Sequence, residues 1–169
     1  MSIQQTPGHV LPARSAAKME AAMAVGAFAI GTGEFAIMGL MPDIAHNLNL
    51  SEPQVGHAIS AYALGVMVGA PLLAILGAKL LRKHMLLLLM GLYALGNLAT
   101  AFTPTFGSLV AFRFISGLPH GAYFGIAAVV ASSMVPTDKR AGAVARVMMG
   151  LTLAMLLGNP IATFLGQYL

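Results

Sequence analysis

The stretch MLLLLMGLYALGNLATAFT, residues 85–103, decides the fold class of this chain. It contains no charged residue, and it is about as long as a helix that crosses the hydrocarbon core of a bilayer, roughly 20 residues. Its hydrophobic residues follow one another without the alternation of a barrel strand. Because only helices and closed barrels satisfy their backbone hydrogen bonds in lipid, we expect a transmembrane helix here.

The rest of the chain has the same character. Of its 169 residues, 58% are hydrophobic and 8% are charged, whereas soluble domains carry about 25% charged residues. This composition excludes an ordinary soluble domain, and it also excludes a disordered chain, which needs few hydrophobic residues and many charges. We therefore predict an all-α integral membrane protein, with a cytoplasmic tail over residues 1–20 and a transmembrane helical domain over residues 21–169. The five expected spans are residues 21–41, 56–78, 85–103, 109–135 and 147–168.

The basic residues predict the orientation of these spans. If the crossings alternate, eight of the nine Lys and Arg residues fall on one side of the membrane. This is the positive-inside pattern, and it places the N-terminus in the cytoplasm. The net charge of +4 then reflects membrane orientation, so we expect the lipid bilayer as a partner and no nucleic acid. The eight residues are Arg14, Lys18, Lys79, Arg82, Lys83, Lys139, Arg140 and Arg146.

Two formal charges lie deep within the expected spans, Glu34 in the first and Arg113 in the fourth. A charge at the bilayer centre costs about 2.5–3.5 kcal/mol or more, and such residues usually serve a function. Glu34 and Arg113 either form a structural ion pair that locks two helices, or belong to a proton or substrate site that faces a wet cavity. Arg113 keeps its proton under ordinary conditions, so it can act only as a fixed charge. His120 lies on nearly the same helix face as Arg113, and it either titrates near neutral pH or is simply hydrogen-bonded.

Small residues recur at helical spacing in the spans and predict close helix packing. In the fourth span they follow Arg113 at intervals of four. In the fifth span Pro160 predicts a kink, and Asn159 belongs to a weakly polar stripe with Thr152 and Thr163, which either lines a cavity or bonds a neighbouring helix. The glycines of the second, fourth and fifth spans in this set are Gly65, Gly69, Gly117, Gly121, Gly125 and Gly158.

Several chemistries have no signal in this sequence. It has no cysteine, which excludes disulfides and thiolate metal sites. We find no nucleophile with an adjacent base, no cluster of metal ligands and no phosphate-binding loop after a strand. We therefore expect neither an enzyme nor a bound metal or cofactor.

At this point the residues resemble a known family. The string GEFAIMGLMPDIA, residues 33–45, resembles the first helix of major facilitator superfamily efflux transporters, in the drug/proton antiporter or arabinose-efflux-permease-like branch. Arg113 with Gly117 and Gly121 is similar to the family's fourth-helix motif R-x-x-x-G-x-x-x-G. The glycines around Pro160 resemble the fifth-helix antiporter motif. The motif between the second and third helices is partly present, in Gly77, Arg82 and Lys83, but its Asp and second Gly are missing.

The resemblance implies two six-helix halves that rock around a midplane site, with this chain forming most of the N-terminal half. It implies that Arg113 belongs to proton coupling and that Glu34 is a proton or substrate carboxylate. The expected function is proton-coupled efflux of a drug, sugar or metabolite across a bacterial inner membrane. On this interpretation the chain is an N-terminal fragment, and its partners are protons, a small-molecule substrate and the missing C-terminal half. The alternative is a small membrane scaffold or partner subunit without transport of its own. The sequence does not reveal the substrate.

Overall fold

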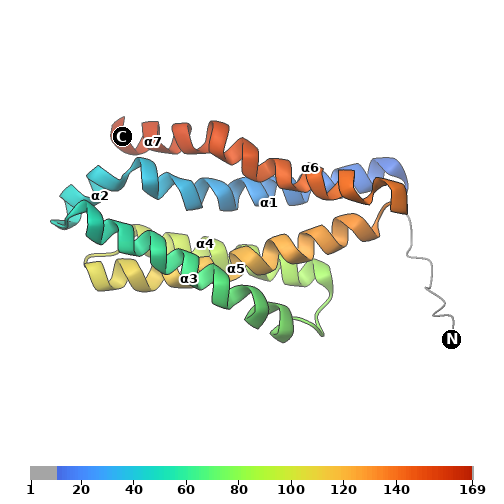
Figure 1. The fold of residues 1–169 in the computed structure, drawn as a ribbon, viewed down its shortest axis with the longest axis horizontal. Helices are drawn as coiled ribbons and strands as arrows, with labels where there is room; N and C mark the ends of the chain where they lie inside the picture. Colours follow the sequence, from blue (N-terminus) through green and yellow to red (C-terminus); the bar gives the residue numbers. More distant parts are fainter. Residues whose placement is uncertain (1–10, 169) are drawn as a thin grey trace.

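A computed structural model describes residues 11–168, and it confirms the all-α prediction (Figure 1). Among these residues the five helices long and apolar enough to cross a membrane are α1, α3, α4, α5 and a broken fifth span of α6 and α7. The short helix α2 joins α1 to α3. The bounds are α1 Ala13–Gly39, α2 Met41–Leu48, α3 Glu52–Leu76, α4 Arg82–Ala101, α5 Phe106–Ser133, α6 Arg140–Leu153 and α7 Asn159–Tyr168.

The helices extend beyond the apolar stretches that predict them. Helix α1 begins at Ala13 rather than near residue 21, and it includes the basic residues Arg14 and Lys18. The reason is physical: hydropathy marks only the part of a helix that lies in hydrocarbon, whereas the backbone bonding continues into the polar interface. Residues 1–10 of the expected tail lie outside the described residues.

The connection after α1 contains a short helix that is not among the five expected spans. Helix α1 ends at Gly39, and Pro42 lies in the first turn of α2. Proline is well suited to a first turn, where its missing N–H would have no partner inside the helix. Asn49 then ends α2 in the left-handed conformation, with φ 56°. Ser51 is the N-cap residue of α3, and its backbone N–H donates to the side chain of Gln54 at 2.9 Å.

Helices α3 and α5 cross at closely fitted glycines. A Cβ atom built on Gly65 would overlap the carbonyl of Phe114, and one on Gly117 would overlap the carbonyl of Tyr62. The predicted small-residue stripe therefore lets two backbones meet, as in other membrane helix pairs. Further along the same crossing, Gly69 meets the backbone of Leu118 and Gly121 meets Ala70. A Cβ on Gly125 has no described atom within 4 Å, so a packing role there stays a prediction.

The fifth span packs along α1 through a second series of small residues. Gly150 faces the backbone of Ala24, and Gly158 faces the side chain of Thr32. Between α6 and α7 the chain forms a π-helical turn, Ala154–Gly158, directly before Asn159 and Pro160. A π turn is one of the ways a helix absorbs an irregularity. Here it accompanies the proline that the sequence marks as a kink.

Two tyrosines tie α4 and α5 to α1. The hydroxyl of Tyr123 donates to the carbonyl of Met23 at 2.9 Å, and the hydroxyl of Tyr93 donates to the carbonyl of Ile30 at 2.8 Å. Each hydroxyl fills the space beside a glycine of α1, Gly26 for Tyr123 and Gly33 for Tyr93. The same arrangement thus occurs twice, seven residues apart. Seven residues are about two helical turns, so both sites lie on one side of α1.

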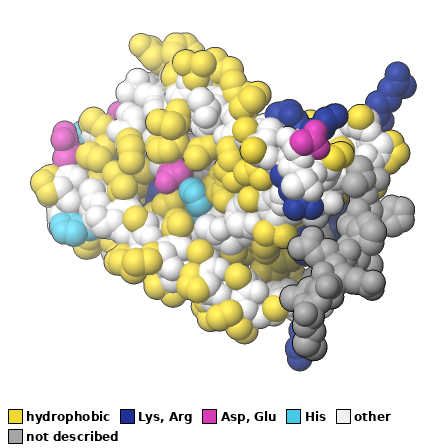
Figure 2. Space-filling view, turned by 45° about the vertical axis from the view of Figure 1, so that its right-hand side comes forward, with side chains coloured by type: hydrophobic (Ala, Val, Ile, Leu, Met, Phe, Trp, Pro, Cys, Tyr) yellow, Lys and Arg dark blue, Asp and Glu magenta, His cyan; other side chains and the backbone are white. Residues whose placement is uncertain are grey.

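The basic residues lie where the topology brings three helix ends together. The start of α1, the turn from α3 to α4 and the turn from α5 to α6 all lie at one end of the bundle (Figure 1). The space-filling view shows Lys and Arg side chains gathered at that end, and a largely hydrophobic surface over the middle (Figure 2).

Candidate functional site

A polar cluster lies within the hydrophobic bundle, where α1, α3 and α5 meet. The Glu34 carboxylate oxygen Oε2 of α1 is 3.8 Å from Nδ1 of His120 on α5. The same Nδ1 atom is 2.9 Å from the hydroxyl of Tyr62 on α3. Figure 2 shows an acidic and a histidine side chain side by side within a hydrophobic surface. Each of the three helices thus contributes one titratable side chain to the cluster.

Arg113 is the fourth residue of the cluster, and its guanidinium lies against the face of the Tyr62 ring. Its guanidinium carbon lies 4.3 Å from the centre of the Tyr62 ring, which is the geometry of a cation–π contact. Its Nη1 donates to the backbone carbonyl of Gly33 at 3.2 Å. The side chain is buried, and among residues 11–168 its Nε and Nη2 atoms have no hydrogen-bond partner.

Glu34 and Arg113 are therefore neighbours without being a salt bridge. The two ion pairs found among residues 11–168 join Glu34 to His120 and Glu20 to Arg146. The Arg113 guanidinium contacts the ring of Tyr62, whereas the Glu34 carboxylate contacts the imidazole of His120. A direct lock between the carboxylate and the guanidinium, the structural alternative for this pair, is absent from the described part of the chain.

The local sequence explains how these side chains come together. Arg113, Gly117 and His120 share one face of α5, because residues three, four and seven apart lie on the same side of a helix. Gly117 brings α5 against the backbone of α3 at Tyr62. That close approach places the Tyr62 side chain in contact with both Arg113 and His120. The glycine packing and the polar cluster thus arise from one helix crossing.

The cluster is partly open on one side. The Glu34 side chain is 26% exposed and that of His120 is 13% exposed, whereas Arg113 is 2% exposed. A solute can therefore reach the carboxylate, while the guanidinium is sealed beneath it. The imidazole nitrogen that faces Glu34 can hold a proton for the carboxylate or accept a hydrogen bond from the Tyr62 hydroxyl. The arrangement can share one proton between Glu34 and His120, and it can place a cationic group beside the carboxylate.

The other predicted site residues lie outside this cluster. Asn159 is in the first turn of α7, and its Oδ1 accepts a hydrogen bond from Thr163 at 3.5 Å, within the same helix. Gly77 packs against the side chain of Met85, next to the turn that joins α3 to α4. Arg82 and Lys83 are exposed in the first turn of α4 and line a separate cavity.

Two features of the structure escaped the sequence analysis. The bridging position of Tyr62 depends on the crossing of α3 and α5, which no linear pattern specifies. The second feature is an ion pair near the basic end of the bundle, between the buried carboxylate of Glu20 and the exposed side chain of Arg146. Nε and Nη2 of Arg146 both donate to this carboxylate, the second at 3.1 Å. Glu20 is 3% exposed. A signal was available, since both residues stand at the same end of their predicted spans with opposite charges.

Comparisons with known proteins agree with this architecture. A family model described as Major Facilitator Superfamily matches residues 23–169. The inner membrane transport protein YdhP of Escherichia coli is 50% identical over 146 residues, which are 86% of this chain and 38% of that protein. The putative transporter AraJ of the same species is 43% identical over 89% of this chain and 38% of its own length. A chloramphenicol resistance protein of Streptomyces lividans is 37% identical over 87% of this chain and 38% of its length. The chain thus spans less than two fifths of these relatives.

Proposed function

We propose that this chain, which belongs to the Major Facilitator Superfamily, forms the N-terminal part of a transporter. We propose further that this transporter exports a small molecule and is coupled to protons. Membership makes the chain a multi-pass membrane protein of a transporter family. The proton coupling, the direction of transport and the role of a second half are our proposals. The observation that carries the proton coupling is the Glu34 carboxylate beside His120, partly exposed within a membrane-spanning bundle. The direction and the second half are proposed from the names and the length of the relatives.

Glu34 is suited to bind a proton and a substrate in turn. A buried charge in a membrane helix is costly in free energy. Glu34 can avoid this cost in two ways, by pairing its carboxylate with a cationic group or by taking up a proton and becoming neutral. Binding of a cationic or polar substrate group at the carboxylate would displace the proton. The displaced proton would leave to the inner side by way of His120. A new proton from the outer side would then protonate Glu34 and release the substrate there, so that protons enter as substrate leaves.

Arg113 and Tyr62 hold the cluster in place while the proton moves. Arg113 is fixed by the Gly33 carbonyl and by the Tyr62 ring. Its permanent charge biases Glu34 electrostatically without sealing it in a salt bridge. The Tyr62 hydroxyl orients the imidazole through Nδ1. A rigid support of this kind keeps the carboxylate and the imidazole within reach of each other.

Chloramphenicol is the first substrate to test, because one relative is a chloramphenicol resistance protein. A sugar is the second, because a probable sugar efflux transporter of Helicobacter pylori is 33% identical over 86% of this chain. The test uses a transporter of the relatives' length that begins with this sequence, in membrane vesicles with an imposed proton gradient. Glu34→Gln should abolish gradient-driven transport at a near-normal protein level, because the amide keeps the shape but cannot ionise.

An exposed carboxylate, that of Glu52, provides the control for Glu34→Gln. Glu52→Gln changes an exposed carboxylate in the first turn of α3 and should leave transport unchanged. Full gradient-driven transport by Glu34→Gln would contradict the proposed coupling. Wild-type transport by the double variant Glu34→Gln with Arg113→Gln would contradict it as well, and would assign both charges to structure.

The orientation in the membrane is a further part of the proposal. The positive-inside rule puts the basic end of the bundle in the cytoplasm. Reporter fusions after Lys83 should then show cytoplasmic activity, and a fusion after Asn49 should show external activity. A cytoplasmic signal from the Asn49 fusion would reverse the assignment.

A further inference from the structure

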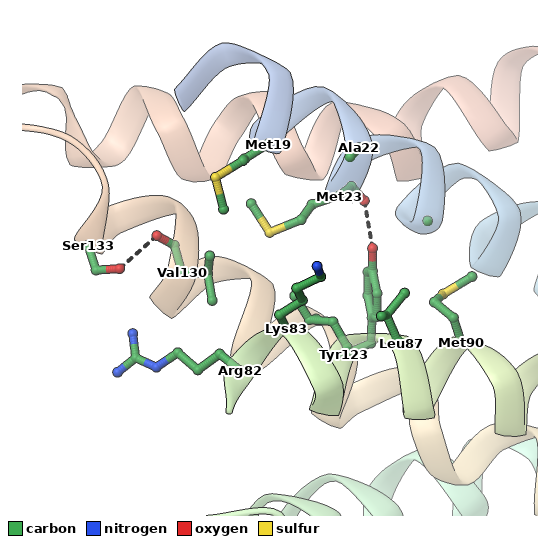
Figure 3. Close-up of a pocket in the computed structure, with 12 residues that line it drawn as sticks. Met19, Ala22, Met23, Arg82, Lys83, Leu87, Met90, Tyr123, Val130 and Ser133 are labelled. Carbon is green, nitrogen blue, oxygen red and sulfur yellow. Dashed lines mark hydrogen bonds between the residues drawn. The ribbon is translucent and has the colours of Figure 1, made fainter. Parts of the chain in front are cut away.

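A second cavity lies away from the polar cluster, between α1, α4 and α5, at the basic end of the bundle (Figure 3). Its volume is about 550 Å³, within the range of sites for small organic molecules. The walls are hydrophobic and flexible: Met19 and Met23 come from α1, and Leu86, Leu87 and Met90 come from α4. Tyr123 forms the inner wall, and its hydroxyl donates a hydrogen bond to the carbonyl of Met23. Unbranched methionine side chains adapt to irregular apolar groups.

Two cations stand at this otherwise apolar cavity. Lys83 and Arg82 belong to the first turn of α4, and both line the cavity. In Figure 3 the Lys83 ammonium group points from α4 toward α1, across the space between Met23 and Leu87. Neither residue takes part in the ion pairs found among residues 11–168. The cavity therefore combines a hydrocarbon-like wall with positive charges that have no acidic partner in the described part of the chain.

We propose that this cavity binds an anionic phospholipid, with an acyl chain between α1 and α4 and the phosphate on Lys83 and Arg82. Basic pockets between transmembrane helices on the cytoplasmic side recognise anionic head groups. The charges lie at the end of α4, as a head group requires, and the apolar wall continues from there along the helix, as a chain requires. Arg and Lys both donate charge-assisted hydrogen bonds to phosphate oxygens.

Other occupants match only half of this chemistry. A further apolar helix would fill the groove but would gain nothing from the two exposed cations beside it. A water-soluble anion would satisfy the cations but would gain nothing from Met19, Met23 and Leu87. A phospholipid satisfies both requirements, and the bilayer supplies it at high concentration at this depth.

The chain contains no tryptophan, so a single introduced tryptophan reports on this cavity alone. Leu87→Trp places the reporter at the cavity, and Leu72→Trp places a matched reporter on the exposed face of α3, near the same end of the bundle. Each variant is placed in phosphatidylcholine vesicles that contain a small fraction of brominated lipid, either phosphatidylglycerol or phosphatidylcholine. Bromine quenches tryptophan only at short range, so the comparison measures which lipid lies at each site.

We expect brominated phosphatidylglycerol to quench the Leu87→Trp reporter at a much lower fraction than brominated phosphatidylcholine. The preference should be roughly fivefold for each basic side chain, hence about 25-fold for two, from the usual attraction of a basic residue to anionic lipid. Arg82→Gln combined with Lys83→Gln should remove this preference. Lys79→Gln, which changes a neighbouring basic residue that does not line the cavity, should leave it intact. The Leu72→Trp reporter should respond to both lipids almost equally.

Equal quenching of the Leu87→Trp reporter by the two lipids would overturn the proposal, as would a preference that survives the double variant. No quenching by either lipid, in this chain or in a longer transporter that begins with it, would show that protein fills the groove and would also overturn the proposal. Native mass spectrometry of the unsubstituted chain provides a reading independent of the reporters. Retained phosphatidylglycerol that is lost in the Arg82→Gln/Lys83→Gln variant supports the site, and equal retention by both chains contradicts it.

Discussion

The contact between Tyr123 and Gly26 allows a sharp test of how α5 is held against α1. Tyr123→Phe removes one buried hydrogen bond, that to the Met23 carbonyl. Side-chain hydrogen bonds between membrane helices contribute about 0.6 kcal/mol on average and up to about 1.7. We therefore expect a loss of about 1 kcal/mol in the free energy of unfolding.

The glycine partner gives the second single variant. A Cβ on Gly26 would overlap the Tyr123 hydroxyl and would come within 2.7 Å of the ring carbon that carries it. Overpacking of this kind costs about 1–3 kcal/mol, and the better helix propensity of alanine returns about 1 kcal/mol. Gly26→Ala alone should therefore destabilise the protein by about 0–2 kcal/mol.

The double variant tests whether the stability losses of the two single variants simply add. When Tyr123→Phe has removed the hydroxyl, the ring is no longer held to Met23 and can tilt away from the new methyl group. We expect the double variant to lose less than the measured sum of the two single variants, which the estimates above put at about 1–3 kcal/mol. Unfolding in detergent by denaturant, followed by circular dichroism, measures all three. Gly91→Ala, at a site with no described atom within 4 Å, is the control. Additive losses would refute the claim that the hydroxyl and the glycine share one space.

Two further predictions concern helix packing and charge. Gly121→Leu should lower the yield of folded protein in the membrane, because the side chain would meet Ala70, whereas Gly125→Leu should not, and equal yields would count against the stripe as a contact face. Arg146→Gln should lower the thermal unfolding temperature more than Glu20→Gln, because the first leaves a buried carboxylate without its partner and the second leaves an arginine that can turn to water. Thermal unfolding in detergent compares the two, and a larger loss for Glu20→Gln would reverse the argument.

The fold class could be predicted from the sequence because a membrane helix is marked by a continuous run of apolar residues. Residues 85–103 are apolar throughout, and a lipid environment leaves such a run almost no alternative to helix. Close helix packing at Gly65, Gly69, Gly117 and Gly121 could also be predicted, since these glycines repeat at helical spacing, but not that α3 and α5 are the helices that meet there. The short helix α2 and the early start of α1 were missed, because both lie where polar and apolar residues mix near the interface.

The candidate site could be predicted only in part. Glu34 and Arg113 stand out because charges are rare in membrane spans, and His120 follows from its place on the face of Arg113. Which of these groups touch was beyond the sequence, since that depends on how three helices rotate against one another. The Tyr62 side chain contacts both the guanidinium and the imidazole, and the ion pair that Glu34 forms is with His120.

The central claim is that Glu34 takes up and releases a proton within the membrane, and infrared difference spectroscopy measures this without knowledge of the substrate. Spectra of the protein in lipid are recorded at two pH values, and the band of a protonated carboxyl group is followed. The account predicts that the wild-type band contains a titrating component that is missing in Glu34→Gln and remains in Glu52→Gln. This component should shift in His120→Gln, because the imidazole lies 3.8 Å from the carboxylate. An identical band in the wild type and in Glu34→Gln would contradict the claim.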